Sequence, residues 1–209
     1  MGAIEHRGAM GWPPFGPDDR ERCADLARRG IQHAAGDVTV LAHCGIALVQ
    51  CVKDYDWSMA VLAAAHEDNP NDLIAAAAVA TGHLHCGSLD TALALCARAL
   101  RLNPRHPFAH IAHTCMAHAH IVRGNYPDAL DSAARARALN TNFDATLWML
   151  TAANAHLGRI DEARHFLAAL LELAPGVTIA RIRAGQPAKD PGRIEPILQG
   201  LRLAGLPEK

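Results

Sequence analysis

Apolar and polar positions along most of the chain follow the period of an α-helix. Runs such as LIAAAAVATGHL and MAVLAAAH are separated by short polar turns that contain Gly, Pro or Asn. Alanine supplies much of the apolar character, and it has the highest helix propensity of all residues. The pattern therefore predicts closely packed helices joined by short turns, rather than a sheet.

The predicted helices recur at a regular interval. Three sequence features advance together, by 37 and then by 34 residues. They are a turn glycine (Gly87, Gly124, Gly158), an early alanine in the next helix (Ala92, Ala129, Ala163) and a residue after that helix (Asn103, Asn140, Ala174). Because three separate positions move in register, the sequence indicates an internal repeat built from two helices.

This pattern resembles the tetratricopeptide repeat, a unit of about 34 residues with two antiparallel helices. In residues 144–177 the consensus positions fall on Leu147, Leu150, Thr151, Asn154, Ala163, Leu167, Leu170 and Pro175. The resemblance implies an all-α fold, a helical solenoid that winds as a right-handed superhelix and ends in a C-terminal capping helix. The turn glycine would permit a left-handed backbone, and the small alanine would let two helices cross closely.

The repeat frame divides the chain into three parts. The array is expected over 18–177, and a single unit cannot bury its apolar face without neighbours. Its units are a half-unit at 18–37 and repeats at 38–72, 73–106, 110–143 and 144–177. The first full repeat carries about one extra residue, in VKDYDW.

Both ends depart from the repeat. Residues 1–17 are rich in Gly and Pro and are predicted to be irregular. Residues 178–209 are interpreted as capping helices over the last repeat. The alternative is a tail that folds back into the groove. Because the array begins in mid-unit, we expect a fragment of a longer protein or a start placed inside one.

The end of the chain carries a narrower resemblance, in LNTNFDATLWMLTAANAHLGRIDEAR, LAPGVTIARIRAG and ILQGLRLAGLPEK. It resembles the carboxy-terminal repeat region of bacterial adenylate/guanylate cyclase-like proteins and of winged-helix regulators. The resemblance implies the interaction or regulatory region of a bacterial signalling or transcription regulator. The sequence contains no cyclase domain or winged helix, so we expect neither activity here.

Composition and charge exclude several classes of function. The formal net charge is −1, with 20 Lys and Arg against 21 Asp and Glu, and no basic stripe suited to nucleic acid. No run is long enough to cross a membrane, and no signal sequence begins the chain. The six cysteines form no CxxC pair. We therefore expect a cytoplasmic protein with reduced thiols.

Sequence motifs for catalysis are missing. GxSxG, HExxH, phosphate-binding loops and dinucleotide fingerprints do not occur. Asp90, Asp128 and Glu162 recur in phase with the repeat, which assigns them to the first turns of helices. The chain is therefore predicted to be noncatalytic and to need no cofactor.

The segment HPFAHIAHTCMAHAH, residues 106–120, contains five histidines. His110 and His113 share one helix face, which makes them a weak candidate pair for a metal ion. His113 and His120, however, occupy consensus aromatic positions, so packing explains their spacing. We favour packing and predict no metal site. The alternative function is a metal or small-ligand sensor that uses this His-rich middle repeat.

The resemblance assigns function to the concave groove, which is formed by the first helix of each repeat. We expect a protein or peptide partner there, including another domain of a parent regulator or a second copy of the chain. Trp148 is the one large anchor, although it would equally well pack against a neighbouring repeat. The partner-binding residues expected in the groove are Ala77, Thr81, Leu84, His85, Thr114, His118, Ile121, Trp148, Ala152 and His156.

Overall fold

The computed structural model describes residues 1–10 and 16–209, and every regular element in this part of the chain is helical. The all-α fold class predicted from the sequence is therefore confirmed. The first helices are α1 (Gly2–Met10) and α2 (Pro17–His33). Four helix pairs follow: α3 (Val38–Ala47) with α4 (Tyr55–Asp68), α5 (Leu73–Cys86) with α6 (Leu89–Leu102), α7 (Ala109–Val122) with α8 (Tyr126–Leu139), and α9 (Asp144–His156) with α10 (Ile160–Leu173).

Local sequence signals set the limits of these helices. Asp37, Asp54, Asp72 and Ser88 each accept a hydrogen bond from the backbone N–H three residues on, so they begin α3, α4, α5 and α6. Gly124 and Gly158 turn the chain between paired helices at φ +72° and +73°. Gly87 differs from the expectation, because its φ is −127°. Its small size matters instead, since a Cβ there would collide with the His83 ring.

The extra residue of the first repeat is absorbed inside a helix. After Ala47, α3 continues as a π-helical turn, η1 (Leu48–Val52), which ends at Lys53 with φ +65°. A π turn accommodates a single inserted residue without breaking the helix. The insertion therefore widens the end of the first helix rather than lengthening the VKDYDW loop alone.

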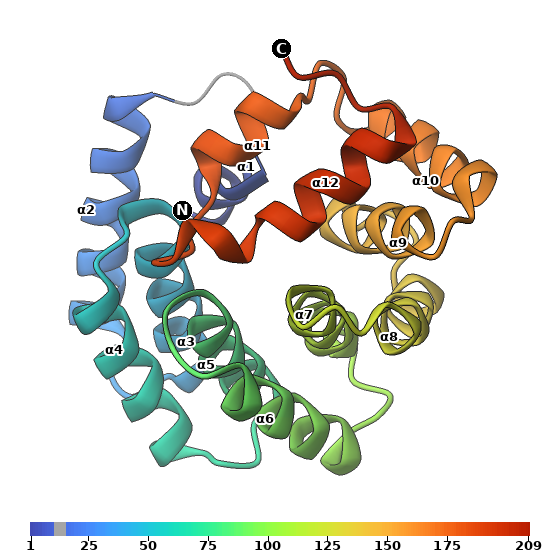
Figure 1. Cartoon of the computed structure of the whole chain (residues 1–209). Helices are drawn as coiled ribbons and strands as arrows, with labels where there is room; N and C mark the ends of the chain where they lie inside the picture. Colours follow the sequence, from blue (N-terminus) through green and yellow to red (C-terminus); the bar gives the residue numbers. More distant parts are fainter. Residues whose placement is uncertain (11–15) are drawn as a thin grey trace.

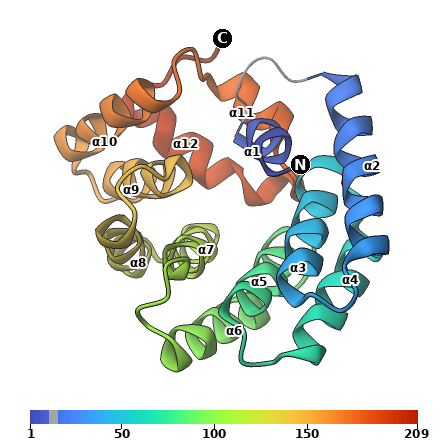
Figure 2. The ribbon, with the colours of Figure 1, turned by 180° about the vertical axis from the view of Figure 1, so that it is seen from behind.

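The helix pairs curve into a ring whose two ends meet (Figures 1 and 2). Helix α1 packs against η1, α2 and α11 (Ile179–Gly185), which joins the amino-terminal and carboxy-terminal parts. A 3-10 turn, η2 (Pro191–Arg193), then leads into α12 (Glu195–Ala204). Helix α12 packs mainly on α9 and also reaches α7. It covers the last repeat from the concave side.

The largest side chains of the core gather in the carboxy-terminal half. Leu147 and Leu150 of α9 are packed with Ile197, Leu198 and Leu201 of α12, and all are at most 2% exposed. The middle repeats are instead packed through alanines and cysteines such as Ala92 and Cys96. The tail therefore supplies the apolar surface that the Ala-rich repeats lack, which makes it part of the core.

The amino-terminal segment differs from its predicted form. Residues 2–10 form helix α1 rather than an irregular segment, whereas residues 11–15 of the predicted segment lie outside the described residues. The sequence GAIEHRGAM has two glycines and no helical apolar period, so a short helix here depends on tertiary contacts. Ala9 and Met10 supply them, because both are buried. Within residues 1–10 and 16–209, no helix is long and apolar enough to span a membrane.

Candidate functional site

The concave side of the ring contains a cavity of about 370 Å³. Its walls come from α3, α5, α7 and α9, which are the first helices of the four repeats. Helix α1 lies across it, and the Gln186–Pro187 segment of the tail lines one end. The volume falls at the lower end of the range for small-molecule pockets.

The walls are built from equivalent positions of successive repeats. Three sets of positions, related by the steps of 37 and 34 residues, line the cavity in α5, α7 and α9. A fourth set lines it only in α5 and α7. The sets are Ile74, Ile111 and Ala145; Ala77, Thr114 and Trp148; Ala78, Cys115 and Met149; and Thr81 with His118. Stacking of identical units thus produces one continuous surface.

The cavity contains seven of the residues predicted for the groove. These residues are Ala77, Thr81, Leu84, His85, Thr114, His118 and Trp148. Three other predicted residues lie elsewhere. Ile121 is fully buried in the core between repeats. Ala152 is covered by Gly200 of α12.

His156, the third of these residues, is in contact with the tail. Its Nε2 lies 2.6 Å from the carbonyl oxygen of Pro196. Its ring stacks on Tyr126, with centroids 4.2 Å apart and planes 9° from parallel. The tail therefore covers the groove over the last repeat and leaves the surface of the earlier repeats around the cavity.

Several lining residues were not predicted from the sequence, and one signal would have found three of them. Ile74, Ile111 and Ala145 lie three residues before a predicted groove position, which places them one turn earlier on the same face. Applying the repeat step to that turn would have identified them. Met10, Gln186 and Pro187 have no such signal, because they come from the two ends of the chain.

The threonine hydroxyls of the cavity are satisfied by their own helices. Thr81 donates to the carbonyl oxygen of Ala77 at 2.8 Å. Thr114 lies 2.8 Å from the carbonyl oxygen of His110 and 2.7 Å from Thr146 Oγ1. By contrast, Trp148 Nε1 and His85 Nδ1 are buried without a hydrogen-bond partner among the described residues. Such atoms are uncommon in folded proteins, and each calls for an explanation.

Two histidines of the cavity are held neutral. The rings of His85 and His118 meet edge to face at 5.8 Å. Burial, the neighbouring His118 and the charge of Arg193 lower the pKa of His85 to about 3. Burial lowers the pKa of His118 to about 4, and the charge of Arg193 acts in the same direction. Both side chains are therefore uncharged near neutral pH.

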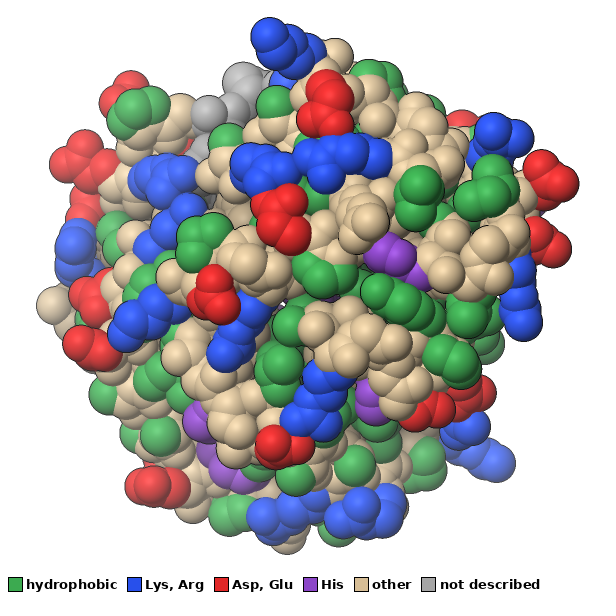
Figure 3. Space-filling view, in the orientation of Figure 1, with side chains coloured by type: hydrophobic (Ala, Val, Ile, Leu, Met, Phe, Trp, Pro, Cys, Tyr) green, Lys and Arg blue, Asp and Glu red, His purple; other side chains and the backbone are tan. Residues whose placement is uncertain are grey.

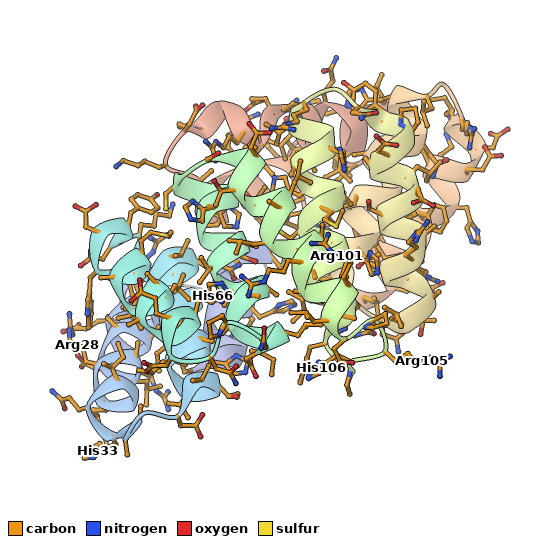
Figure 4. The ribbon with its side chains drawn as sticks, turned by 90° about the horizontal axis from the view of Figure 1, so that it is seen from below. Arg28, His33, His66, Arg101, Arg105 and His106 are labelled. Carbon is orange, nitrogen blue, oxygen red and sulfur yellow. The ribbon has the colours of Figure 1, made fainter. Side chains whose placement is uncertain are left out.

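Apart from Asp144, which is buried, the Lys, Arg, Asp and Glu side chains that the structure describes are at least partly exposed. Figure 3 shows Lys, Arg, Asp and Glu spread over the surface with both signs interspersed. Arg28, His33, His66, Arg101, Arg105 and His106 come from α2, α4, α6 and the loop after it, and none of these six lines the cavity (Figure 4). Among the lining residues that the structure describes there is no Lys, Arg, Asp or Glu. The described part of the lining is therefore mainly apolar, and histidines, including the His6 that meets Asp144, are among its few polar side chains.

Of the candidate metal pair, His110 is engaged in hydrogen bonds with the protein. His110 Nδ1 lies 3.1 Å from the carbonyl oxygen of Pro107, and its Nε2 lies 3.3 Å from Asn140 Nδ2. Burial lowers the pKa of His113, and Arg135 and Asp131 are the charged groups that act on it. Over residues 1–10 and 16–209, no three His, Cys, Asp or Glu side chains are grouped so that they could hold a metal ion.

Comparison with known proteins relates the chain to repeat proteins by structure. No protein-family model matches the sequence, and no curated protein matches it. The chain is similar to PilW, described as a widely conserved type IV pilus biogenesis factor, with 14% identity, a TM-score of 0.62, and 90% of this chain and 82% of PilW covered. It is similar to a chain of the APC/C hetero-tetramer Cut9–Hcn1 with 16% identity and a TM-score of 0.64, covering 96% of this chain but 38% of that one.

YrrB, described as a TPR protein with an unusual peptide-binding site, is also similar. It shares 16% identity, with a TM-score of 0.51, and the match covers 87% of this chain and 96% of YrrB. At these identities the likeness is one of fold. The chain therefore has a tetratricopeptide-repeat fold, as its sequence period predicts.

Proposed function

We propose that the chain is a noncatalytic scaffold for protein interaction, which binds a segment of a partner protein on the concave side of the ring. The partner segment would contact the first helices of the repeats, where Ala77, Thr114 and Trp148 lie in equivalent positions. Small and apolar residues there allow close approach of a helix or extended peptide, and Trp148 offers a large contact surface.

One observation carries this proposal: a segment of the chain itself already lies on this surface. Helix α1 crosses the cavity, and His6 Nε2 on it lies 3.0 Å from Asp144 Oδ2 at the start of α9. At its other end, the carbonyl oxygen of Ala9 accepts a hydrogen bond of 3.3 Å from Gln186 Nε2. The concave surface thus accommodates a short helix through side-chain contacts, as a peptide-binding groove would.

A partner helix would have to take the place of α1. An α-helix with its side chains is about 10–12 Å in diameter, which is more than the present cavity accommodates beneath α1. Helix α1 has nine residues and depends on tertiary contacts, so its displacement costs less than that of α12, whose apolar face is fully buried. We therefore place the binding event at the mouth occupied by α1.

Peptides selected from a displayed random library on the full-length chain would test this function. Ala145 lines the cavity, so Ala145→Trp should lower the affinity for the selected peptides about tenfold or more. Ala138 of α8 is exposed, so Ala138→Trp is the matched control and should leave affinity unchanged. Failure to select any peptide would refute the scaffold function. Peptides indifferent to Ala145→Trp would refute the concave site.

The resemblance at the end of the chain supports a setting for this interaction. We infer that the chain serves as the interaction region of a bacterial signalling or transcription regulator in the cytoplasm. The partner segment would then belong to another domain of that regulator or to a second copy of the chain. Light scattering of the purified chain, at rising concentration, distinguishes the second copy from the other domain.

A further inference from the structure

We propose that the cavity beneath α1 is a binding site for one uncharged small molecule with an apolar body and a hydrogen-bond acceptor. This activity is separate from the binding of a protein segment, because it uses the space that remains while α1 is in place. Three independent features of the cavity support it: the apolar wall, the unpartnered donor and the absence of charge among the described lining residues.

The wall provides the contact surface for an apolar body. Ile74, Ile111 and Met149 come from three successive repeats, and Met10 of α1 faces them across the cavity. A pocket of this size lined mainly by apolar side chains, with a few polar atoms, is the usual form of a small-molecule site. Of the lining residues, Gly2, His43 and Phe108 are exposed, so the cavity reaches solvent beside them.

Trp148 provides the point of polar recognition. The side chain is 3% exposed, it lines the cavity, and its Nε1 has no acceptor in the part of the chain that the structure describes. An indole N–H can only donate, so the complementary group is a carbonyl, ether or hydroxyl oxygen on the ligand. His85 is 6% exposed and also lines the cavity, and its unpartnered Nδ1 supplies a second polar atom. A ligand oxygen would satisfy a donor that the fold leaves unmet.

The scarcity of charged groups in the described lining disfavours the binding of ions. The described lining residues include no Lys, Arg, Asp or Glu, and the two histidines that meet there, His85 and His118, have pKa values lowered to about 3 and about 4. An anion or cation entering this cavity would lose its hydration without gaining a Lys, Arg, Asp or Glu partner among the described lining residues. The occupant is therefore an uncharged molecule such as a ketone, ester or alcohol with a hydrocarbon body.

The test uses the fluorescent ketone 6-propionyl-2-dimethylaminonaphthalene, which is uncharged and has one carbonyl acceptor on an aromatic body. Titration of the full-length chain into this dye should give a saturable blue shift with one site and a dissociation constant of about 100 μM or lower. The anionic dye 1-anilinonaphthalene-8-sulfonate should bind at least about tenfold more weakly, because the described lining residues include no Lys or Arg to pair with its sulfonate.

Three variants locate the site. Trp148→Phe keeps an aromatic ring but removes the donor, and it should weaken binding of the ketone about three- to tenfold. Trp57→Phe is the matched control, because Trp57 lies on α4 outside the cavity, and it should bind like the parent chain. Ala145→Trp should abolish saturable binding by filling the space. Circular dichroism confirms that each variant is folded.

Several outcomes would overturn the proposal. The first is a dye signal that does not saturate, which is expected if the cavity holds only water. The second is an equal loss of ketone affinity in the Trp148 and Trp57 variants. The third is sulfonate binding as tight as that of the ketone. None of these measurements involves a partner peptide, so the proposal stands or fails independently of the scaffold function.

Discussion

Gly200 of α12 lies directly on Ala152 of α9. A Cβ on residue 200 would come within 2.5 Å of the Ala152 Cα and 2.9 Å of its carbonyl oxygen. Two small residues therefore allow the backbones of these helices to approach closely. Through this contact the tail covers the groove over the last repeat, which confines the open concave surface to the region beneath α1.

Replacement of Gly200 by Ala should therefore destabilise the chain. Alanine ordinarily stabilises a helix interior by about 0.5–1 kcal/mol relative to glycine. Here the added methyl meets backbone atoms that cannot move aside, and overpacking of this kind costs about 1–3 kcal/mol. We expect the free energy of unfolding in urea to fall by about 1–2 kcal/mol. Gly2→Ala is the control, since a Cβ there meets nothing within 4 Å. A more stable Gly200→Ala variant would show that α12 is free to shift on α9.

Arg193 is the side chain that attaches the tail to the second repeat, beside a backbone hydrogen bond from Lys189 to His85. Its guanidinium donates to the carbonyl oxygens of His83 at 3.2 Å, Leu84 at 2.5 Å and Gly87 at 2.7 Å, where α5 ends. A cation at this position also interacts favourably with the helix dipole. Arg193→Met should lower the free energy of unfolding by about 2 kcal/mol, because several charge-assisted bonds are lost.

Arg183 provides the comparison for Arg193. It pairs with Glu195 on the surface, with the two side chains 47% and 44% exposed, and such pairs contribute about 0–1 kcal/mol. Urea unfolding of Arg183→Met should therefore resemble that of the parent chain. Hydrogen exchange in residues 186–193 should accelerate only in Arg193→Met. Equal exchange in both variants would count against Arg193 as the attachment point.

Stability should fall on mild acidification because of the buried histidines. Burial, together with the neighbouring His118 and the charge of Arg193, lowers the pKa of His85 to about 3, against about 6.5 in the unfolded chain. Between these two pKa values the unfolded state binds more protons than the folded state. The contribution of neutral, buried His85 to the free energy of unfolding is therefore complete above pH 6.5 and is lost as the pH falls. We expect a loss of up to about 1.4 kcal/mol per pH unit from this group below pH 6.

The measurement for this pH dependence is a series of urea unfolding curves at pH 7, 6 and 5. His85→Gln removes the titrating group, whereas the carboxylates remain common to both chains. The difference in free energy of unfolding between the parent and His85→Gln should therefore shrink as the pH falls. A difference in free energy of unfolding that stays constant from pH 7 to pH 5 would mean that His85 takes up a proton without loss of structure.

The extent to which the sequence predicted this molecule follows from the range of each interaction. Helices and repeat units were predictable because turn glycines, caps and the apolar period act over a few residues. Walls of the cavity follow from the same repeat, since Ile74, Ile111 and Ala145 occupy one position three times. The contact between Gly200 and Ala152 joins positions far apart in the chain, and no local pattern reports it.

Helix α1 is a second feature that the sequence did not predict. Its two glycines and missing apolar period give no reason to expect a helix, and contacts such as that of Gln186 with Ala9 form only after the ring has closed. The tail and α1 together reduce a groove predicted over three repeats to a cavity. The role of its residues in binding a partner stays a prediction.

The contact between His6 and Asp144 gives a direct test of whether α1 competes with a partner segment. Asp144 is 2% exposed, and its Oδ2 lies 3.0 Å from His6 Nε2. His6→Ala removes this contact and should weaken the docking of α1, because the buried carboxylate loses a partner. Apparent affinity rises with the fraction of molecules in the competent state, so selected peptides should bind several-fold more tightly.

The control for this last prediction is His33→Ala, because His33 is exposed at the end of α2 (Figure 4). Hydrogen exchange of residues 2–10 should increase in His6→Ala alone, while the repeats keep their protection. Peptide affinity, measured on the same samples, should rise only in that variant. Faster exchange in α1 without a gain in affinity would show that partner segments do not bind where α1 lies, and the binding surface would then have to be sought outside the concave side.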